Sequence, residues 1–177
     1  MDTFLEYLVK RKSTGRDFAV KLGIVLLTLL CMSLVFTLFM SVELLRSFGL
    51  LAVVAVVYGA YIWLRNLDLE YEYIFTNGDL DIDAIKGRKV RKRLTSVSCR
   101  GIELMASSED SVHKNEFENE SITKKIDAVY DRAAGGIYCV IFTDKGERKL
   151  LSFQPPQKLV ESMKTYNPRC IFPMKAE

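Results

Sequence analysis

The sequence predicts an α+β membrane protein, in which a two-helix transmembrane hairpin is followed by an antiparallel β-sheet or partial barrel with a C-terminal capping helix. Three observations lead to this fold class. Two long uncharged stretches lie near the N-terminus, apolar and acidic residues alternate on both sides of Asn77-Gly78, and an amphipathic segment follows two consecutive prolines near the C-terminus. The apolar residues are therefore concentrated in a membrane part, and residues 66–177 form a separate soluble domain.

The two uncharged stretches have the length that a bilayer requires. Residues 22–42 contain 21 positions without a charge and residues 47–64 contain 18. At about 1.5 Å of rise per residue they extend roughly 31 and 27 Å, close to the thickness of a bilayer core. A core helix of a soluble protein carries a polar stripe, which neither stretch has, and a cleaved signal peptide has a shorter apolar region. We therefore expect two transmembrane helices.

Basic residues beside these stretches predict the orientation in the membrane. Five of them lie within residues 1–21, whereas the connecting outer loop 43–46 contains only Arg46. Because Lys and Arg resist translocation, we expect the N-terminus in the cytoplasm. Two spans return the chain to the same side, which predicts a multi-pass protein of the plasma membrane with residues 66–177 in the cytoplasm.

Residues 1–21 are expected to form an amphipathic and basic N-terminal segment. Phe4, Leu5, Leu8 and Val9 recur at helical spacing ahead of the basic cluster. This spacing predicts a short helix over residues 2–12, which lies in the membrane interface or docks on the soluble domain.

The cysteine pattern predicts neither a disulfide nor a metal site. Cys31, Cys99, Cys139 and Cys170 are widely spaced, and no C-x-x-C pair occurs. A zinc site made from the last three cysteines and His113 lacks such a pair, and His113 lies in a polar stretch. We expect no cofactor.

The clearest local pattern is LDLEYEYIFTNGDLDIDAI, which predicts a β-hairpin because Asn-Gly is the strongest short hairpin signal. With Asn77 and Gly78 in the turn, six apolar side chains pair on one face of the hairpin: Phe75 with Leu80, Tyr73 with Ile82 and Tyr71 with Ala84. A slip of one residue would destroy this agreement, so the register is well defined.

The opposite face of the hairpin collects the carboxylates Glu70, Glu72, Asp81 and Asp83, and six cations follow: Lys86, Arg88, Lys89, Arg91, Lys92 and Arg93. A three-residue turn over 86–88 would place Arg91 opposite Asp83 and Arg93 opposite Asp81. Lys92 fits this register badly, which leaves a bulge or a longer turn open. The basic run 86–93 has two interpretations: contact with an anionic lipid or a partner, or compensation of the acidic strands.

The rest of the domain shows weaker patterns. The third strand is expected to be interrupted at Gly101 and to resume over 102–105, ahead of a mobile acidic loop over 106–121. Residues 122–131 fit a strand or a helix, and we favour a strand.

The C-terminal third has clearer signals. Two β-rich runs flank the turn 144–146 and predict a second hairpin. The segment 156–166 predicts an amphipathic helix that begins at a proline, and Ile171 and Phe172 in the tail after it are expected to cover a sheet edge.

Several antiparallel strands followed by one helix are similar in arrangement to pleckstrin-homology-like (PH-like) domains. The stretches YEYIFTNGDLDIDAI, RKRLTSVSCRGIELMA and ESMKTYNPRCIF also resemble those of a clostridial family of small two-helix membrane proteins that carry a bacterial PH-like domain. The resemblance covers most of the chain. It implies a PH-like architecture and a membrane location, and it implies no catalytic residue.

These features favour a non-enzymatic binding or scaffold module, held at the inner leaflet, that engages a protein partner or a lipid headgroup. The first alternative is an anionic-lipid sensor that uses the basic run 86–93. A small oligomeric pore or transport accessory is another, because Ala55 and Gly59 give the second span a face for helix packing or homo-oligomerisation. Neither span contains the charged residue that an ion pathway usually requires.

Enzymes and nucleic-acid-binding proteins are disfavoured. The chain lacks G-x-S-x-G, a phosphate-binding glycine loop and H-E-x-x-H, so we expect no catalytic residue. Residues 66–177 contain 18 basic and 18 acidic residues, a balance that argues against a phosphate-binding surface.

Overall fold

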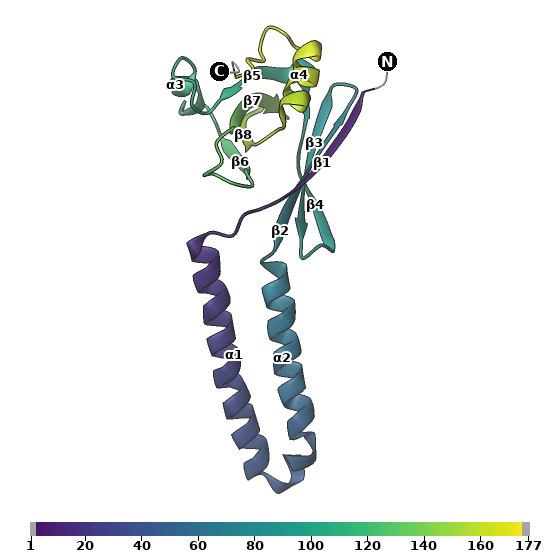
Figure 1. Cartoon of the computed structure of the whole chain (residues 1–177), viewed down its shortest axis with the longest axis vertical. Coiled ribbons are helices and arrows are strands. Elements are labelled where there is room, and N and C mark those ends of the chain that lie inside the picture. Colours follow the sequence, from purple (N-terminus) through teal and green to yellow (C-terminus); the bar gives the residue numbers. More distant parts are fainter. Residues whose placement is uncertain (1–2, 175–177) are drawn as a thin grey trace. The chain divides into compact units, whose positions relative to one another are not determined.

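A computed structural model of the chain describes residues 3–174. These residues form two compact units. One contains the chain up to Arg11 and from Glu70 onward, and the other is Lys12–Leu69. The second unit is therefore an insertion in the sequence of the first, as the colours in Figure 1 show.

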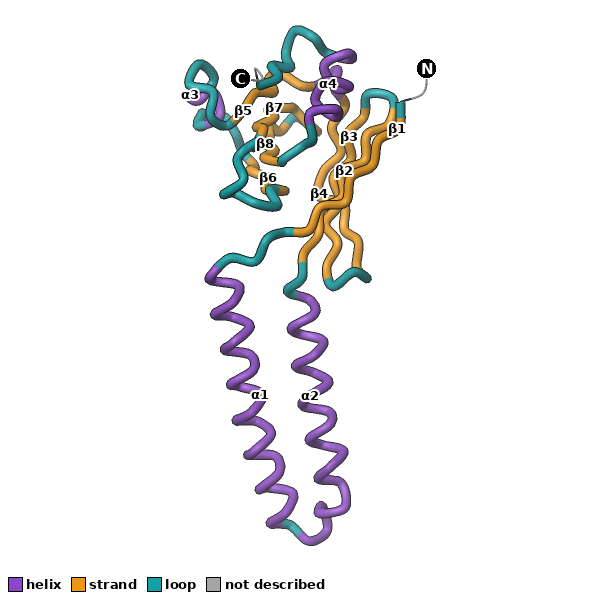
Figure 2. The backbone as a smooth tube through the Cα atoms, in the orientation of Figure 1, coloured by secondary structure: helices purple, strands orange, loops and turns teal. Residues whose placement is uncertain are grey.

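The inserted unit is a helical hairpin. Helix α1 (Gly15–Ser41) and helix α2 (Gly49–Asn66) run side by side in opposite directions, joined by the 3-10 helix η1 (Glu43–Phe48) (Figure 2). Thr14 caps α1, because its hydroxyl accepts from the backbone N–H of Asp17 while the Asp17 carboxylate accepts from the Thr14 N–H. Both helices are long and apolar enough to cross a membrane, and only 6% of the most apolar window of each is buried.

The first sheet has the strand order β1-β2-β3-β4 and contains β1 (Phe4–Lys10), β2 (Leu69–Thr76), β3 (Asp79–Lys86) and β4 (Val90–Ser98). Strands β1 and β2 are antiparallel, from Phe4 opposite Thr76 to Lys10 opposite Glu70. The two strands that flank the helical hairpin in sequence are therefore direct neighbours in one sheet.

The prediction of a helix over residues 2–12 was wrong for the residues that the structure describes; Asp2 lies outside them. Along β1 the side chains alternate between exposed and half-buried, which is a period of two. Leu5, Tyr7 and Val9 supply that period, but Leu5, Leu8 and Val9 also fit a helix, so the local pattern is ambiguous. Pairing with β2 is what makes this segment a strand and not a helix.

The hairpin of β2 and β3 agrees with its prediction. Asn77 and Gly78 have φ values of 50° and 98°, the left-handed conformation that a tight two-residue turn requires. The six apolar side chains expected on one face are all buried: Tyr71, Tyr73, Phe75, Leu80, Ile82 and Ala84.

The register predicted between β3 and β4 was wrong. Asp83 lies opposite Arg93, and Lys86 lies opposite Val90, so that the turn is 87–89. The register shifts between Ile82 and Asp83, where Leu94 is the extra residue of a β-bulge. The poor fit of Lys92 to the simple register was the sequence signal for this bulge.

The second sheet has the order β5-β7-β8-β6. Its strands are β5 (Ile102–Ser107), β6 (Lys124–Ala128), β7 (Tyr138–Asp144) and β8 (Glu147–Phe153). The predicted interruption at Gly101 is confirmed, since the 3-10 helix η2 (Cys99–Gly101) separates β4 from β5 and the chain changes sheets there. The strand over 122–131 and the second hairpin are also confirmed, but β6 pairs with β8 in parallel. The sheets do not close into a barrel.

A buried tyrosine joins the two sheets. Tyr73 is fully buried, its ring lies edge-on to Phe153 at 5.6 Å, and its hydroxyl donates to the carbonyl of Ala128 at 2.7 Å. Burial raises the pKa of the Tyr73 hydroxyl well above its usual range, so it stays a hydrogen-bond donor. The core of this unit therefore lies between the sheets.

Helix α4 (Gln157–Tyr166) confirms the helix predicted over 156–166. Pro156 precedes it, and Leu159, Val160 and Met163 are fully buried. Beyond the helix, Ile171 is 1% exposed and forms a β-bridge with Met105. This bridge confirms that the tail covers the edge of β5.

The stretch 106–121, expected to be a mobile loop, is partly built into the domain. Ala106 belongs to β5, and a short helix, α3 (Lys114–Phe117), carries the buried Phe117. Phe117 packs with Leu104 and Ile141 on one face of the second sheet. One aromatic residue in a polar stretch is enough to attach the loop, and a search for periodicity does not detect it.

We therefore predict that Phe117→Ala releases this loop. The substitution leaves a cavity and should lower the free energy of unfolding by about 3 kcal/mol. Hydrogen exchange of the amides of 114–122, in the detergent-solubilised full chain, measures the loss of protection.

Val112→Ala in the same loop is the matched control. Val112 is 78% exposed, so its truncation should change stability by no more than about 0.5 kcal/mol. Equal exchange in the two variants would contradict the attachment of the loop through Phe117.

Candidate functional site: the charged end of the first sheet

Four carboxylates lie on the outer face of the first sheet, on β2 and β3. The alternation that turns the tyrosines of β2 toward the core turns Glu70 and Glu72 to the other face, and the same holds for Asp81 and Asp83 on β3. Glu70, Glu72 and Asp83 are nevertheless buried, with 8%, 4% and 3% of their surface exposed. Buried carboxylates require compensating charges, which the β3–β4 turn and β4 provide.

Three arginines of the basic run cover these carboxylates. The Arg88 Nε lies 3.3 Å from the Glu70 Oε1, and the Arg91 Nη2 lies 2.8 Å from the Glu72 Oε1. Arg93 pairs with Asp81 at 2.7 Å and also with Asp83. The bulge at Leu94 puts Arg91 and Arg93 on the acidic face. The ion pairs expected between Arg91 and Asp83 and between Arg93 and Asp81 are both present, the first at 4.0 Å, although the register differs.

One carboxyl group in this network is imperfectly compensated. The Oε2 of Glu72 is buried without a hydrogen-bond donor among the described residues. Burial raises the pKa of Glu72; Arg91 opposes this shift, and the neighbouring carboxyls of Glu6 on β1 and Asp83 on β3 reinforce it. The neutral form of Glu72 is therefore favoured more than in an exposed carboxyl.

The three lysines of the run behave differently from the arginines. Lys86, Lys89 and Lys92 are exposed, and within residues 3–174 none of them forms an ion pair. Lys92 lies opposite Ala84, which puts it on the face that the arginines do not occupy. In the sequence the six cations form one run, and the poor fit of Lys92 to the simple register was the signal that not all of them share one face.

The small residues predicted to pack the helices face a hollow. Ala55 and Gly59 line a cavity of about 180 Å³ with Thr28, Cys31 and other residues of α1 and α2. A Cβ added at Gly59 would meet no atom within 4 Å, whereas one at Gly49 would lie 3.3 Å from Phe39 Cβ. Of these two glycines, only Gly49 is therefore closely packed against α1, and packing through Ala55 and Gly59 stays a prediction.

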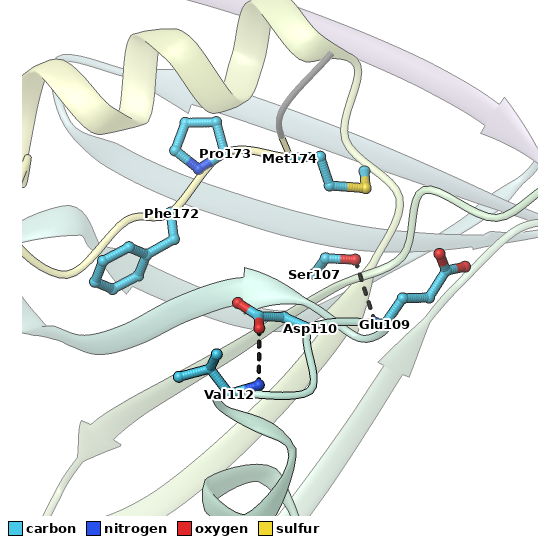
Figure 3. A pocket seen from close by; sticks show the side chains of 7 residues that line it. All are labelled: Ser107, Glu109, Asp110, Val112, Phe172, Pro173 and Met174. Atoms are coloured by element: carbon cyan, nitrogen blue, oxygen red, sulfur yellow. Dashed lines mark hydrogen bonds between the residues drawn. The ribbon is translucent and has the colours of Figure 1, made fainter. Parts of the chain in front are cut away.

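A hollow in the sheet-containing unit lies beside the C-terminal tail (Figure 3). It measures about 790 Å³ and is lined by seven residues: Ser107, Glu109, Asp110, Val112, Phe172, Pro173 and Met174. The Ser107 Oγ accepts from the Glu109 N–H and the Asp110 Oδ1 from the Val112 N–H, so both groups stabilise local turns.

His113 is attached to the same region. Its Nδ1 lies 2.9 Å from the Asp110 Oδ2, and its ring stacks on Phe172 at 4.9 Å. The hydrogen bond with His113 lowers the pKa of Asp110. His113 therefore fixes the tail to the loop.

The cysteines are not brought together. Cys99 and Cys139 are buried and Cys31 and Cys170 are half-buried, all four as free thiols. Burial raises the pKa of Cys99 to about 12 and also raises that of Cys139, which keeps both thiols neutral. Within residues 3–174, no three His, Cys, Asp or Glu side chains form a group that could hold a metal ion.

We predict that Arg91→Gln destabilises the first sheet. The change leaves the buried Glu72 and Asp83 without this cation and should cost about 2 kcal/mol, less than a wholly buried pair because Arg91 is half exposed. Hydrogen exchange of the β2 and β3 amides measures the difference. The neighbouring variant Lys92→Gln is the matched control, and destabilisation equal to that of Arg91→Gln would contradict the division of the run.

We also predict that Glu72→Gln stabilises the domain above the pKa of Glu72. A pKa raised in the folded state contributes stability that is present below the unfolded pKa and is lost as the pH rises through the folded value. The variant does not lose this stability. The difference between its free energy of unfolding and that of the native chain should therefore grow with rising pH and vanish in acid. Hydrogen exchange between pH 4 and 8 tests this, and a constant difference would contradict it.

The model of one protein family matches the chain. It describes the bacterial PH-like domain (DUF6106) and matches residues 1–173, which include the helical hairpin and both sheets. No curated protein and no solved structure matches the chain significantly. The clostridial origin implied by the sequence resemblance stays a prediction. Because the match covers nearly the whole chain, the chain belongs to the family of bacterial PH-like domains DUF6106.

Proposed function

We propose that the chain is a membrane-tethered, non-enzymatic binding module, in which α1 and α2 cross the plasma membrane and the PH-like domain is held at its cytoplasmic surface. PH-like domains are generally binding modules without catalytic activity, and the family supports this part of the proposal. The partner is a protein or a lipid headgroup.

The position of the helical hairpin carries the proposal. It interrupts the chain between β1 and β2, which pair over seven residues, and the connections to the helices are only 11–14 and 67–68. Two tethers at one end of a sheet hold a domain at a surface more firmly than one flexible linker does. A helix in the core of a soluble protein is mostly buried, whereas the apolar side chains of α1 and α2 are largely exposed and need a lipid environment.

The pairing of β1 with β2 also supports the predicted topology. Strands of one sheet lie on the same side of a membrane, so an inserted pair of helices must cross it and return. The excess of basic residues before α1 over those in the 43–48 turn indicates that this side is the cytoplasm.

The other functions receive less support. The carboxylates of the first sheet, the strongest cluster of titratable groups described above, are held by arginines, an arrangement that stabilises a sheet rather than one that exposes an acid or a base. A pore would need polar groups in the spans, which have none that are charged. Homo-oligomerisation through the helices remains compatible with a binding module.

We predict a defined pattern of labelling in intact cells. A cysteine introduced by Ser47→Cys, in η1, should react with a membrane-impermeant maleimide, because the turn faces the outside. Ser96→Cys, at an exposed position of β4, should react only after the cells are permeabilised. The unmodified chain, with its four native cysteines, provides the background.

Extraction of the membranes with alkaline carbonate completes the test. The chain should remain in the pellet. Labelling of Ser96→Cys without permeabilisation would show that the orientation is opposite to the one proposed. Release of the chain by carbonate would exclude the membrane spans.

A further inference from the structure

The arginines and the lysines of the basic run differ in their contacts, which indicates that they have different roles. Arg88, Arg91 and Arg93 are occupied by the carboxylates of β2 and β3, and their ion pairs fix the position of the β3–β4 turn. Lys86, Lys89 and Lys92 have no ion pair within residues 3–174. A stabilising role in the fold therefore explains the arginines but leaves the lysines unexplained.

The lysines are close to one another in the strand register. Lys86 lies opposite Val90 and Lys92 lies opposite Ala84, so Lys86 and Lys92 are diagonal neighbours on one face. Lys89 belongs to the turn between them, and Val90 is 60% exposed although it is apolar. Like charges at this spacing repel unless an anion lies between them. The cluster is thus suited to a negatively charged surface with an apolar layer beneath it.

The chain connections limit how far this cluster lies from the helices. From Asn66 at the end of α2 to Glu70 there are four residues, which reach at most about 14 Å when fully extended. The side chain of Glu70 contacts Arg88 of the turn, at 3.3 Å. The turn that carries Lys89 is therefore linked, through Arg88 and Glu70, to a strand that begins only a few residues after the predicted membrane span.

We infer that Lys86, Lys89 and Lys92 form a contact site for anionic phospholipid headgroups of the cytoplasmic leaflet, with Val90 entering the interface between them. The inference rests on the membrane anchoring proposed above. The phosphates of several lipids neutralise the lysines at once, and the arginine–carboxylate network holds the turn in place without taking part in the contact. An acidic protein that occupies the same lysines is the competing interpretation.

Amine footprinting of the full chain in nanodiscs tests the site. The purified chain is reconstituted into discs of phosphatidylcholine alone and into discs that also contain phosphatidylglycerol, and an acylating reagent labels the lysines. Because a lysine near an anionic leaflet gains about 1 kcal/mol, the three lysines should react on the order of fivefold more slowly in the anionic discs. High salt should abolish the difference, since it screens exposed charges.

Lys158 and Lys164 are internal controls. Both are exposed on α4, and α4 packs through Tyr166 against Gly78, at the opposite end of the β2–β3 hairpin. Their labelling should be the same in the two kinds of disc. Equal labelling of Lys86, Lys89 and Lys92 in both discs would overturn the lipid site, and so would protection of all lysines alike.

A charge variant makes the assignment specific. Val90 carries no charge, so we keep it and replace the three lysines together by Gln, with Lys158→Gln/Lys164→Gln as the matched control. With an environment-sensitive dye on Ser96→Cys, anionic discs should shift the emission of the native chain and of the control, but not of the triple variant. A shift that persists in the triple variant would overturn the site.

Failure of this inference is distinguishable from failure of the membrane anchor. A chain that stays in the carbonate pellet but shows no lipid-dependent protection has an anchor without the lysine site. Protection that appears in native membranes but not in anionic discs would assign the lysines to an acidic protein partner and overturn the inference.

Discussion

The pairing of β1 with β2 is the constraint on which the rest of the structure depends. It joins residues on either side of a complete helical hairpin, so the two units share two connections at one end of one sheet. Closing such a long loop costs little more than closing a shorter one, because the entropy of closure rises only with the logarithm of loop length. The antiparallel helices reduce even this cost by returning the chain close to its starting point. The domain is completed only when the segment before the first helix joins the sheet, which makes the hairpin an internal part of the fold and not an appended anchor.

The charged end of the sheet follows from the same arrangement. The strand that leaves α2 begins with acidic residues at alternate positions, and their burial is tolerable only because arginines of the β3–β4 hairpin cover them. The bulge at Leu94 turns Arg91 and Arg93 toward the carboxylates and Lys92 to the other face, while Lys86 and Lys89 remain exposed at the β3–β4 turn. Arginine suits the pairing with buried carboxylates because its planar guanidinium can donate hydrogen bonds from several nitrogens. Lysine suits contact with a hydrated surface because its ammonium is a compact charge on a flexible side chain. The β3–β4 hairpin therefore both stabilises the sheet, through its arginines, and exposes a cationic surface, through its lysines.

Local patterns were sufficient to predict much of this fold. The Asn77-Gly78 turn, the apolar face of β2 and β3 and helix α4 depend on residues that are close in sequence, and each was predicted. The strand β1 was not, because its seven residues satisfy both a helical and a strand period and only the distant β2 decides between them. The parallel pairing of β6 with β8 and the attachment of the loop through Phe117 depend on contacts between distant segments as well. In the candidate site the six cations stay a predicted contact group, and dividing them into paired arginines and exposed lysines needed the ion pairs and the position of one bulged residue.

A disulfide between β1 and β2 tests the central pairing most directly. Phe4 and Thr76 lie directly opposite each other, so Phe4→Cys with Thr76→Cys should form a crosslink on mild oxidation in membranes, which mass spectrometry of non-reduced peptides detects. Phe4→Cys with Ser96→Cys, on β4 at the other edge of the sheet, should not crosslink. The absence of the first crosslink, or equal yields for both pairs, would contradict a sheet that is completed across the helical hairpin.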